Sequence, residues 1–291
     1  MKVSGVWLPV ITPFLNDAVD FQSYEGLIDY YISKGISGLI PLGTTGEGPV
    51  VTENEFEEII DRTIEKTNHR VPVYVGAGGN FTKKVVKKLS IVEKYPVEGI
   101  LSECPYYNRP DQNGLYEHFL QISEATDKNI IIYNIPYRTG VNMQNETLLK
   151  LAEQENIIGV KDSCGDIAQT LALLSEKPEN FSVLTGEDIL FYTNVVNGGE
   201  GGILAASHLC TEVFLDVFQM VKENDHQSAL QRWQEINMMI PLLFKEPNPS
   251  PIKYCLQRLN LIQSNETRLP LTEISNTLKS ELGGNYGTCE N

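Results

Sequence analysis

The sequence has little positive charge, few histidines and no long apolar run, and each shortage excludes a class of protein. It contains 23 lysine and arginine residues against 38 aspartate and glutamate residues, which gives a formal net charge of −15. Surfaces for nucleic acid or anionic membranes need basic patches, so neither partner is expected. No apolar stretch reaches the roughly 18 residues that a membrane-spanning helix requires. The 41% content of hydrophobic residues excludes a disordered chain and predicts a sizeable core.

Cysteine is sparse and unpatterned. The five cysteines are scattered along the chain without CxxC spacing, which is typical of reduced thiols in a cytosol. The apolar stretch from Val3 to Leu15 contains Pro9 and Pro13 and lacks a small-residue cleavage site. We therefore interpret it as a first strand and not as a signal peptide. These features together predict a cytoplasmic protein.

Short β-branched segments alternate with longer amphipathic segments along most of the chain. The expected strands are Gly5–Thr12, Gly38–Gly43, Val71–Ala77, Gly99–Pro105, Asn129–Pro136, Ile157–Asp162, Phe181–Gly186 and Gly201–Ser207. Eight strand–helix units in series predict an α/β fold of the (β/α)8 TIM barrel type, with the active site, over residues 1–224. Residues 225–291 are expected to form a C-terminal helical extension. The alternative is an open doubly wound sheet, but no G-x-G-x-x-G follows the first strand.

One segment between strands also shows where its helix begins. Phe56 and Ile60 recur at helical spacing within residues 53–67. Thr52 followed by Glu55 has the spacing of a capping box, which predicts a helix start at this point.

Active residues of such barrels lie at the carboxyl ends of the strands, and the most informative one here is Lys161. This lysine closes the apolar run from Ile157 to Val160, so partial desolvation should favour its neutral amine. A neutral lysine is a nucleophile for carbonyl groups and forms a Schiff base. The alternative is a lysine that reaches the barrel rim or pairs with an acid.

Other strand ends supply groups that such chemistry needs. Tyr133 could carry protons, although a buried tyrosine more often serves packing. Thr44 and Thr45 lie in a glycine-bounded turn whose hydroxyl and N–H groups suit a carboxylate. Arg138 can hold a carboxylate in bidentate fashion, with Arg109 as its only nearby rival. The alternatives are an ordinary turn and a surface arginine.

Metal chemistry has little support. The four histidines are dispersed, and only His208 falls at a strand end. Five carboxylates near strand ends could together hold Mg²⁺, but an acidic chain needs no such explanation. These are Glu47, Glu103, Asp162, Glu187 and Asp188.

The motifs at these positions resemble those of the dihydrodipicolinate synthase (4-hydroxy-tetrahydrodipicolinate synthase) family, one of the pyruvate-dependent class I aldolases and lyases. The resemblance extends in order over essentially the whole chain. Its matching segments are residues 43–47 (GTTGE), 105–108 (PYYN), 133–140 (YNIPYRTG), 159–162 (GVKD), 248–253 (NPSPIK) and 268–271 (RLPL).

The resemblance implies a role for each matching residue. Lys161 would form the Schiff base with pyruvate, and Tyr133, Thr44 and Tyr107 would relay protons, with Tyr107 coming from a neighbouring subunit. Thr45 would hold the carboxylate of pyruvate and Arg138 that of (S)-aspartate semialdehyde. The backbone around Gly186 and Ile203 would complete the pocket.

The implied activity is condensation of pyruvate with aspartate semialdehyde to 4-hydroxy-tetrahydrodipicolinate, a precursor of lysine and diaminopimelate. The implied assembly is a homotetramer built as a dimer of dimers, without a metal or an organic cofactor. One alternative is another class I aldolase, such as an N-acetylneuraminate lyase or a 2-keto-3-deoxy sugar acid aldolase. A metal-dependent aldolase and a catalytically silent pyruvate-binding sensor are further alternatives.

The sequence departs from the family pattern at several positions near the predicted site. Gly48-Pro49 follows Glu47, Glu103 precedes the PYYN motif, and Tyr137 replaces a common serine or glycine. Lys84 puts a cation where lysine-inhibited members usually carry a carboxylate. We therefore expect weak or absent inhibition by lysine.

Overall fold

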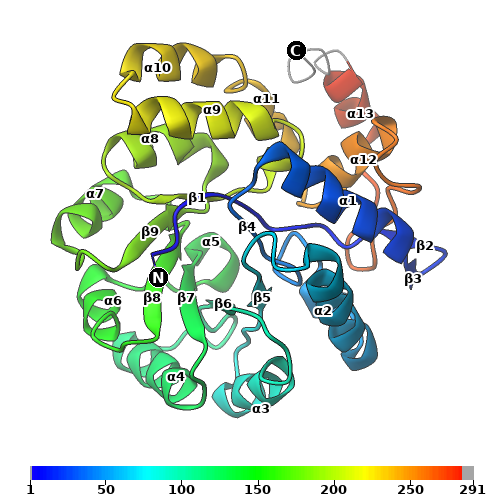
Figure 1. The fold of residues 1–291 in the computed structure, drawn as a ribbon. Helices are drawn as coiled ribbons and strands as arrows, with labels where there is room; N and C mark the ends of the chain where they lie inside the picture. Colours follow the sequence, from blue (N-terminus) through cyan, green and yellow to red (C-terminus); the bar gives the residue numbers. More distant parts are fainter. Residues whose placement is uncertain (1, 284–291) are drawn as a thin grey trace.

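The strands form a closed ring with the helices outside it. The computed structural model describes residues 2–283, and within them eight parallel strands join in the order β4-β1-β10-β9-β8-β7-β6-β5. A bridge between Leu39 and Val73 links the two ends of this order, which closes the barrel (Figure 1). The predicted (β/α)8 barrel is therefore confirmed, and the open sheet is excluded.

All eight predicted strands are present, although most are shorter than predicted. They are β1 (Gly5–Leu8), β4 (Gly38–Leu39), β5 (Tyr74–Gly76), β6 (Gly99–Glu103), β7 (Asn129–Asn134), β8 (Ile157–Asp162), β9 (Ser182–Thr185) and β10 (Gly201–Ile203). The predicted ranges ran past the last ladder hydrogen bonds into the loops that carry the site. A short hairpin, β2 (Phe14–Leu15) with β3 (Ala18–Val19), lies outside the barrel.

The helices surround the barrel and continue beyond it. They are α1 (Phe21–Lys34), α2 (Glu53–Thr67), α3 (Thr82–Val92), α4 (Gln112–Glu124), α5 (Pro136–Thr139), α6 (Asn145–Leu151), α7 (Ile167–Glu176), α8 (Phe191–Val196), α9 (Thr211–Lys222), α10 (His226–Gln234), α11 (Met239–Leu243), α12 (Ser250–Arg258) and α13 (Asn276–Gly283). Single 3₁₀ turns, labelled η, are η1 (Gly48–Val50), η2 (Asp188–Leu190) and η3 (Ala206–His208). The predicted capping box is present, with Thr52 and Glu55 capping α2 reciprocally.

Helices α10 to α13 follow the barrel, as expected for the C-terminal extension. The predicted boundary near residue 224 falls in the turn between α9 and α10, where Asn224 has a left-handed φ of 63°. Phe214 of α9 and Trp233 of α10 nevertheless pack with their ring centroids 5.5 Å apart. The division into residues 1–224 and 225–291 therefore remains a proposal about sequence organisation.

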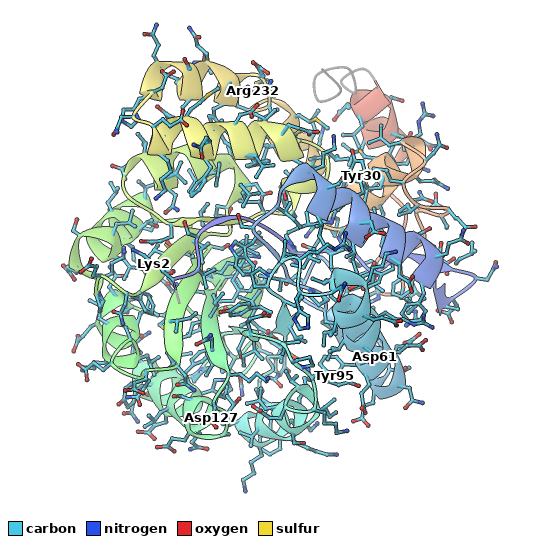
Figure 2. The ribbon with its side chains drawn as sticks, viewed as in Figure 1. Lys2, Tyr30, Asp61, Tyr95, Asp127 and Arg232 are labelled. Carbon is cyan, nitrogen blue, oxygen red and sulfur yellow. The ribbon has the colours of Figure 1, made fainter. Side chains whose placement is uncertain are left out.

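Apolar side chains pack in two layers, one between strands and helices and one inside the barrel. On β7, Ile130 and Ile132 belong to the outer layer, whereas Ile131 and Tyr133 belong to the inner one. This strand is buried on both faces, as a parallel strand under a helical layer must be. Charged side chains lie at the periphery, where Figure 2 shows Asp61 of α2 and Arg232 of α10 on outer helices.

An irregularity on β8 decides which side chain of its C-terminal end faces the interior. The pairing between β7 and β8 skips one residue, because Ile130 pairs with Ile157 and Ile131 pairs with Gly159. An extra residue in one strand reverses the alternation of side chains beyond it. Beyond the skipped Ile158, Val160 therefore joins the outer layer and Lys161 stands inside, beside Tyr133.

The cysteine expectation holds only in part. Cys104 and Cys164 are free thiols, as predicted. Cys210 is disulfide-bonded, so the expectation of a reduced thiol is wrong at that residue. Among the described residues, none of the helices has the length and apolar character needed to cross a membrane.

Candidate active site

Lys161 and Tyr133 lie side by side at the carboxyl ends of neighbouring strands. They are register partners in the ladder between β7 and β8, and the Lys161 Nζ is 4.2 Å from the centre of the Tyr133 ring. Both side chains are buried, with 6% of each residue exposed. The structure thus brings together the predicted nucleophile and a predicted proton carrier.

Burial lowers the pKa of Lys161, as the sequence predicts. Loss of hydration lowers its pKa from 10.5 to about 8, and Arg138 acts in the same direction. The carboxylates of Asp188 and Glu187 oppose this shift but do not cancel it. An amine with a pKa near 8 is partly neutral at physiological pH and can attack a carbonyl carbon.

Gly186 is the residue that allows the backbone to approach this lysine. A Cβ atom at Gly186 would lie 2.5 Å from Lys161 Cε and 2.4 Å from Ser163 Oγ. A side chain at this position would displace Lys161 and Ser163. The backbone at residue 186, which the sequence predicts to line the pocket, therefore requires glycine.

The Tyr133 hydroxyl is held in its protonated form. Burial raises its pKa well above the ordinary value of 10, helped by Tyr137 and Glu187 and opposed by Arg138 and Ser163. A tyrosine that stays protonated can donate one hydrogen bond and accept another, which is the hydrogen-bonding capacity that a member of a proton relay needs.

Thr44 and Thr45 lie in a tight turn between β4 and α2. The Glu47 N–H donates to the Thr44 carbonyl at 3.1 Å, and the Thr45 hydroxyl accepts a hydrogen bond of 2.9 Å from Asn248 Nδ2. A Cβ atom on Gly46 would lie 2.8 Å from the Leu42 nitrogen, so the turn needs glycine at this point. The ordinary-turn alternative explains the glycine but not the hydrogen bond from a residue more than 200 positions away.

Residues of the C-terminal extension hold this turn in place. Glu47, at a left-handed φ of 52°, forms an ion pair with Lys253, and both side chains are essentially inaccessible to solvent. Lys253 Nζ also donates to the Glu266 carbonyl at 2.9 Å and lies 4.2 Å from the centre of the Phe14 ring. Burial lowers the pKa of Lys253 to about 8 despite the Glu47 carboxylate.

Arg138 stands at the mouth of the site, in the short helix α5. It joins two adjoining hollows of about 530 and 470 Å³, which also share Asn248. One hollow contains Tyr137, Gly186, Glu187 and Asp188, and the other contains Thr44 and Tyr133. We call the two together the active-site cleft.

Two predicted site residues, Ile203 and Tyr107, are not among the residues that line the active-site cleft. Ile203, at the end of β10, is fully buried in the inner layer of the barrel together with Tyr133 and Leu184. Tyr107 lies outside the cleft of its own chain, with 89% of the residue exposed and a left-handed φ of 72°.

The structure offers no metal centre among residues 2–283, where no cluster of three or more potential protein ligands occurs. The carboxylates considered for Mg²⁺ are mostly bound to protein groups instead. Asp162 accepts from Thr170 Oγ1 at 2.5 Å, Asp188 accepts from the Ala206 N–H at 2.5 Å, and Glu47 pairs with Lys253. His208 is buried against the Ala205 carbonyl, and burial lowers its pKa to about 4.

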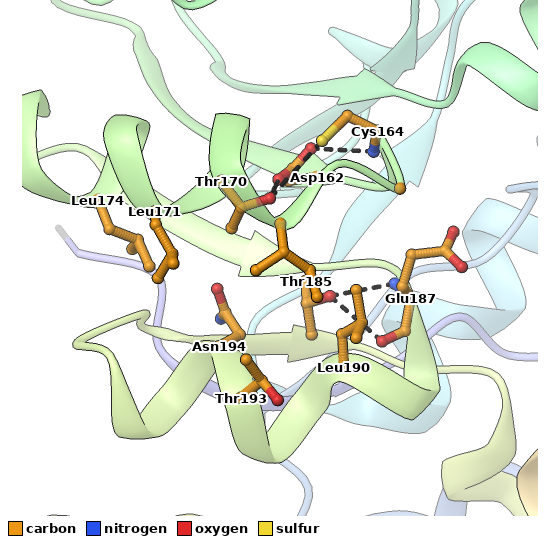
Figure 3. Close-up of a pocket in the computed structure, with 12 residues that line it drawn as sticks. Asp162, Cys164, Thr170, Leu171, Leu174, Thr185, Glu187, Leu190, Thr193 and Asn194 are labelled. Carbon is orange, nitrogen blue, oxygen red and sulfur yellow. Dashed lines mark hydrogen bonds between the residues drawn. The ribbon is translucent and has the colours of Figure 1, made fainter.

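Figure 3 shows a separate small pocket behind the site, between α7 and α8. Leu171, Leu174 and Leu190 line it, and the Asp162 carboxylate closes one side by accepting from the Cys164 N–H at 3.0 Å. The Cys164 thiol is not a nucleophile there, because burial raises its pKa to about 11. This pocket lies mainly within the helical layer and shares Glu187 with the active-site cleft.

Sequence reasoning missed Asn248 and Lys253 as site residues, although both belong to the NPSPIK motif. The sequence did indicate that this lysine is buried, because Lys253 lies between Ile252 and Tyr254 in an amphipathic helix. Its partner Glu47 could not be assigned from sequence distance.

The comparisons with known proteins agree with this geometry. Residues 2–285 match the dihydrodipicolinate synthetase family. A Clostridium acetobutylicum protein named 4-hydroxy-tetrahydrodipicolinate synthase 2 is 53% identical over 97% of this chain and 99% of its own. The dihydrodipicolinate synthase of Thermotoga maritima superimposes with a TM-score of 0.95 at 35% identity, covering 99% of this chain and 100% of that one. The enzyme of Acinetobacter baumannii, solved with pyruvate, gives 0.95 at 31% identity, with 99% of both chains covered. The chain belongs to the dihydrodipicolinate synthetase family.

Proposed function

We propose that the protein is an enzyme that condenses pyruvate with (S)-aspartate semialdehyde to 4-hydroxy-tetrahydrodipicolinate. The observation that carries this proposal is the buried Lys161 amine, which lies against Tyr133 at the carboxyl end of the barrel. Its pKa of about 8 suits attack on the ketone of pyruvate. The resulting Schiff base withdraws electrons from the methyl carbon, so the reaction needs no further cofactor.

The relay around Lys161 would move the protons of this chemistry. In the proposal, Tyr133 and Thr44 take the proton lost when the pyruvate imine becomes an enamine, and Thr45 holds the pyruvate carboxylate. Thr44 and Tyr133 line the same hollow of the cleft, which supports their cooperation. The Asn248 hydrogen bond orients the Thr45 hydroxyl.

Arg138 would bind the carboxylate of the second substrate. Its guanidinium lies at the junction of the two hollows, so an aldehyde held by it faces the enamine on Lys161. The enamine carbon then attacks the aldehyde carbon, and the substrate amine closes the ring and releases the lysine.

Tyr107 would complete the relay only in an assembly. Its side chain and that of the neighbouring Tyr106 are exposed, 89% and 41% respectively, and Tyr107 lies outside its own cleft. We propose a homotetramer, built as a dimer of dimers, in which this tyrosine enters the cleft of the neighbouring subunit. Its expected place in the cytoplasm stays a prediction.

The test is pyruvate consumption by the purified protein with aspartate semialdehyde, and in parallel with N-acetylmannosamine or a 2-keto-3-deoxy sugar acid. Turnover with the semialdehyde alone supports the proposal. Turnover with a sugar substrate alone would assign the protein to the sugar-acid aldolases. Imine formation without turnover of any aldehyde would indicate that the protein is a catalytically silent pyruvate-binding sensor.

A further inference from the structure

The carboxylates near the cleft differ in how far protein groups satisfy them within the described residues. Asp162 and Asp188 accept protein hydrogen bonds, and Glu47 pairs with Lys253. Glu103 lies on the far side of the cleft, beside Lys88 and Tyr106. Glu187 has a buried Oε1 atom that accepts no hydrogen bond in the part of the chain that the structure describes.

The backbone around Glu187 fixes where this carboxylate points. The Glu187 N–H donates to Thr185 Oγ1 at 3.1 Å, and its carbonyl accepts from the same hydroxyl at 3.2 Å. Figure 3 shows these two bonds, with the Glu187 carboxylate turned away from the pocket between α7 and α8. A Cβ atom on the preceding Gly186 would lie 2.5 Å from Lys161 Cε, so Glu187 follows a backbone position that lies close to the lysine.

The charges that surround Glu187 define what it can bind. Lys161, Asp162 and Ser163 face it from β8 and its end, Arg138 faces it from α5, and Asp188 follows it in the chain. The negative charge of Glu187 also raises the pKa of Tyr133 and that of Tyr137. Glu187 and Arg138 line the same hollow, so a carboxylate and an ammonium group of one small molecule can be bound there together.

We propose that Glu187 is the residue that recognises the ammonium group of the second substrate and accepts its proton before ring closure. This inference rests on the proposed function. An amino aldehyde with a carboxylate carries one negative and one positive group, which match Arg138 and Glu187. A sugar acid carries no ammonium group and leaves Glu187 unpaired.

The proton transfer balances with the ring closure. The ammonium N–H bond breaks and its proton passes to a Glu187 oxygen. The freed nitrogen lone pair then forms a bond to the carbon of the protonated imine, and the electron pair of the C=N double bond moves onto Lys161 Nζ. A second proton moves from this nitrogen to Lys161 Nζ, the bond between the imine carbon and Nζ breaks, and the ring C=N bond forms. Lys161 leaves as its neutral amine, and Glu187 returns its proton to water through the open cleft.

Burial supports the role of proton acceptor, because it raises the pKa of the Glu187 carboxyl above its ordinary value of 4.5. A carboxylate with a raised pKa is a stronger base than an exposed one. The neighbouring Ser163, Lys161 and Arg138 oppose this rise.

The experiment compares two aldehydes in the Glu187→Gln variant. Aspartate semialdehyde carries the ammonium group, whereas succinic semialdehyde has the same carboxylate and aldehyde without it. Since a hydrogen bond between charged groups contributes more than a neutral one, kcat/KM for aspartate semialdehyde should fall at least about tenfold. The inhibition constant of succinic semialdehyde should stay within about twofold, because its binding does not involve the ammonium group. Borohydride trapping of pyruvate should also stay within about twofold when it is measured well above pH 8, where Lys161 is mostly neutral with or without the Glu187 charge.

Two further variants make the result specific. Glu187→Asp keeps the charge and should recover part of the lost kcat/KM. Glu146→Gln removes one negative charge from an exposed position on α6 and should behave as the wild type. Equal losses for both aldehydes, or no loss with aspartate semialdehyde, would overturn the role of Glu187. If the wild type itself does not turn over aspartate semialdehyde, the proposed function fails instead.

Discussion

At the scale of single residues, the site depends on how burial changes ordinary side chains. Lys161 and Lys253 are both buried lysines with a pKa lowered to about 8, yet their surroundings differ. Lys253 pairs with the buried Glu47 carboxylate and holds structure together. Lys161 instead lies 4.2 Å from the ring centre of Tyr133, which lines the cleft, and no carboxylate forms an ion pair with it among the described residues.

The rate of imine formation should depend on pH through Lys161. Its pKa is lowered from 10.5 to about 8, and only the neutral amine attacks a ketone. The rate of borohydride-trappable imine formation with pyruvate should therefore rise as pH increases toward 8 and level off above it. Lys161→Ala should abolish trapping altogether. A rate that continues to rise to pH 10 would mean that burial does not depress this pKa.

Loss of the Arg138 guanidinium should mainly weaken binding of the second substrate. Replacement by methionine keeps much of the side-chain volume but removes the guanidinium. A charged hydrogen bond contributes about 1.5–3 kcal/mol, so KM for aspartate semialdehyde should rise on the order of tenfold to a hundredfold. Pyruvate trapping on Lys161 measures the first half-reaction and should fall much less, because Arg138 is a minor cause of the lowered Lys161 pKa. An equal loss in both measurements would place Arg138 at the pyruvate site or in the fold.

At the scale of elements, two features position the chemistry. The extra residue on β8 turns Lys161 into the barrel. The segment from Asn248 to Arg268, after α11, anchors the turn that carries Thr44 and Thr45. Arg268 contributes by donating to the Val50 carbonyl and to Glu55 at the start of α2. The extension is therefore part of the active-site architecture and not an appendage.

The Glu47–Lys253 pair should be important for stability because neither charge reaches water. Lys253→Met leaves the Glu47 carboxylate buried without a counter-ion, which should lower the free energy of unfolding by about 3–5 kcal/mol. The double variant Lys253→Met, Glu47→Gln removes both charges and should recover much of this loss. Urea unfolding followed by circular dichroism measures both variants.

The matched control is an exposed ion pair of the same residue types. Lys94 pairs with Glu57 at 3.3 Å on the surface, and Lys94→Met should change the free energy of unfolding by less than about 1 kcal/mol. Similar losses at Lys94 and Lys253 would show that the burial of the second pair is energetically irrelevant.

At the scale of the whole molecule, the relevant properties are net charge and assembly. A formal charge of −15 repels the anions that the site must bind, so the local cations near the cleft must outweigh it. Lys83, Lys84, Lys87 and Lys88 all lie on α3, and Lys88 lines the outer hollow of the cleft.

Assembly can be tested by mixing two inactive variants. Lys161→Ala lacks the nucleophile, and Tyr107→Phe lacks the proposed relay hydroxyl of the neighbouring subunit. If Tyr107 enters the neighbouring cleft, subunit exchange should restore up to about a quarter of wild-type activity, because half of random dimers are mixed and each has one complete site. No recovery after verified exchange would place the Tyr107 hydroxyl outside the neighbouring site.

The lysines of α3 also bear on regulation. Lysine is a cation at its side chain, and Lys84 with its neighbours should repel it from this face of the molecule. Turnover should therefore be unchanged at submillimolar lysine in a coupled assay. Strong inhibition under these conditions would contradict the prediction.

Much of the site could be predicted because strand ends are visible in a sequence. The apolar runs that precede Lys161 and Tyr133 placed both residues at the carboxyl end of the barrel. The lengths of the strands were overestimated, since apolar loop residues such as Ile135 continue the pattern after the ladder ends. The roles of Asn248 and Lys253 could not be predicted, because their partners lie about 200 residues away.

From the sequence alone we could predict the barrel, the order of its strands along the chain and a lysine near the carboxyl end of β8. These follow from periodicity and motifs, which depend on near neighbours in the chain. Only the folded chain shows which carboxylates near the cleft accept protein hydrogen bonds, that the Glu187 Oε1 atom is buried, and that Tyr107 is exposed. Burial and charge interactions depend on distances through space, and only the folded chain sets those distances.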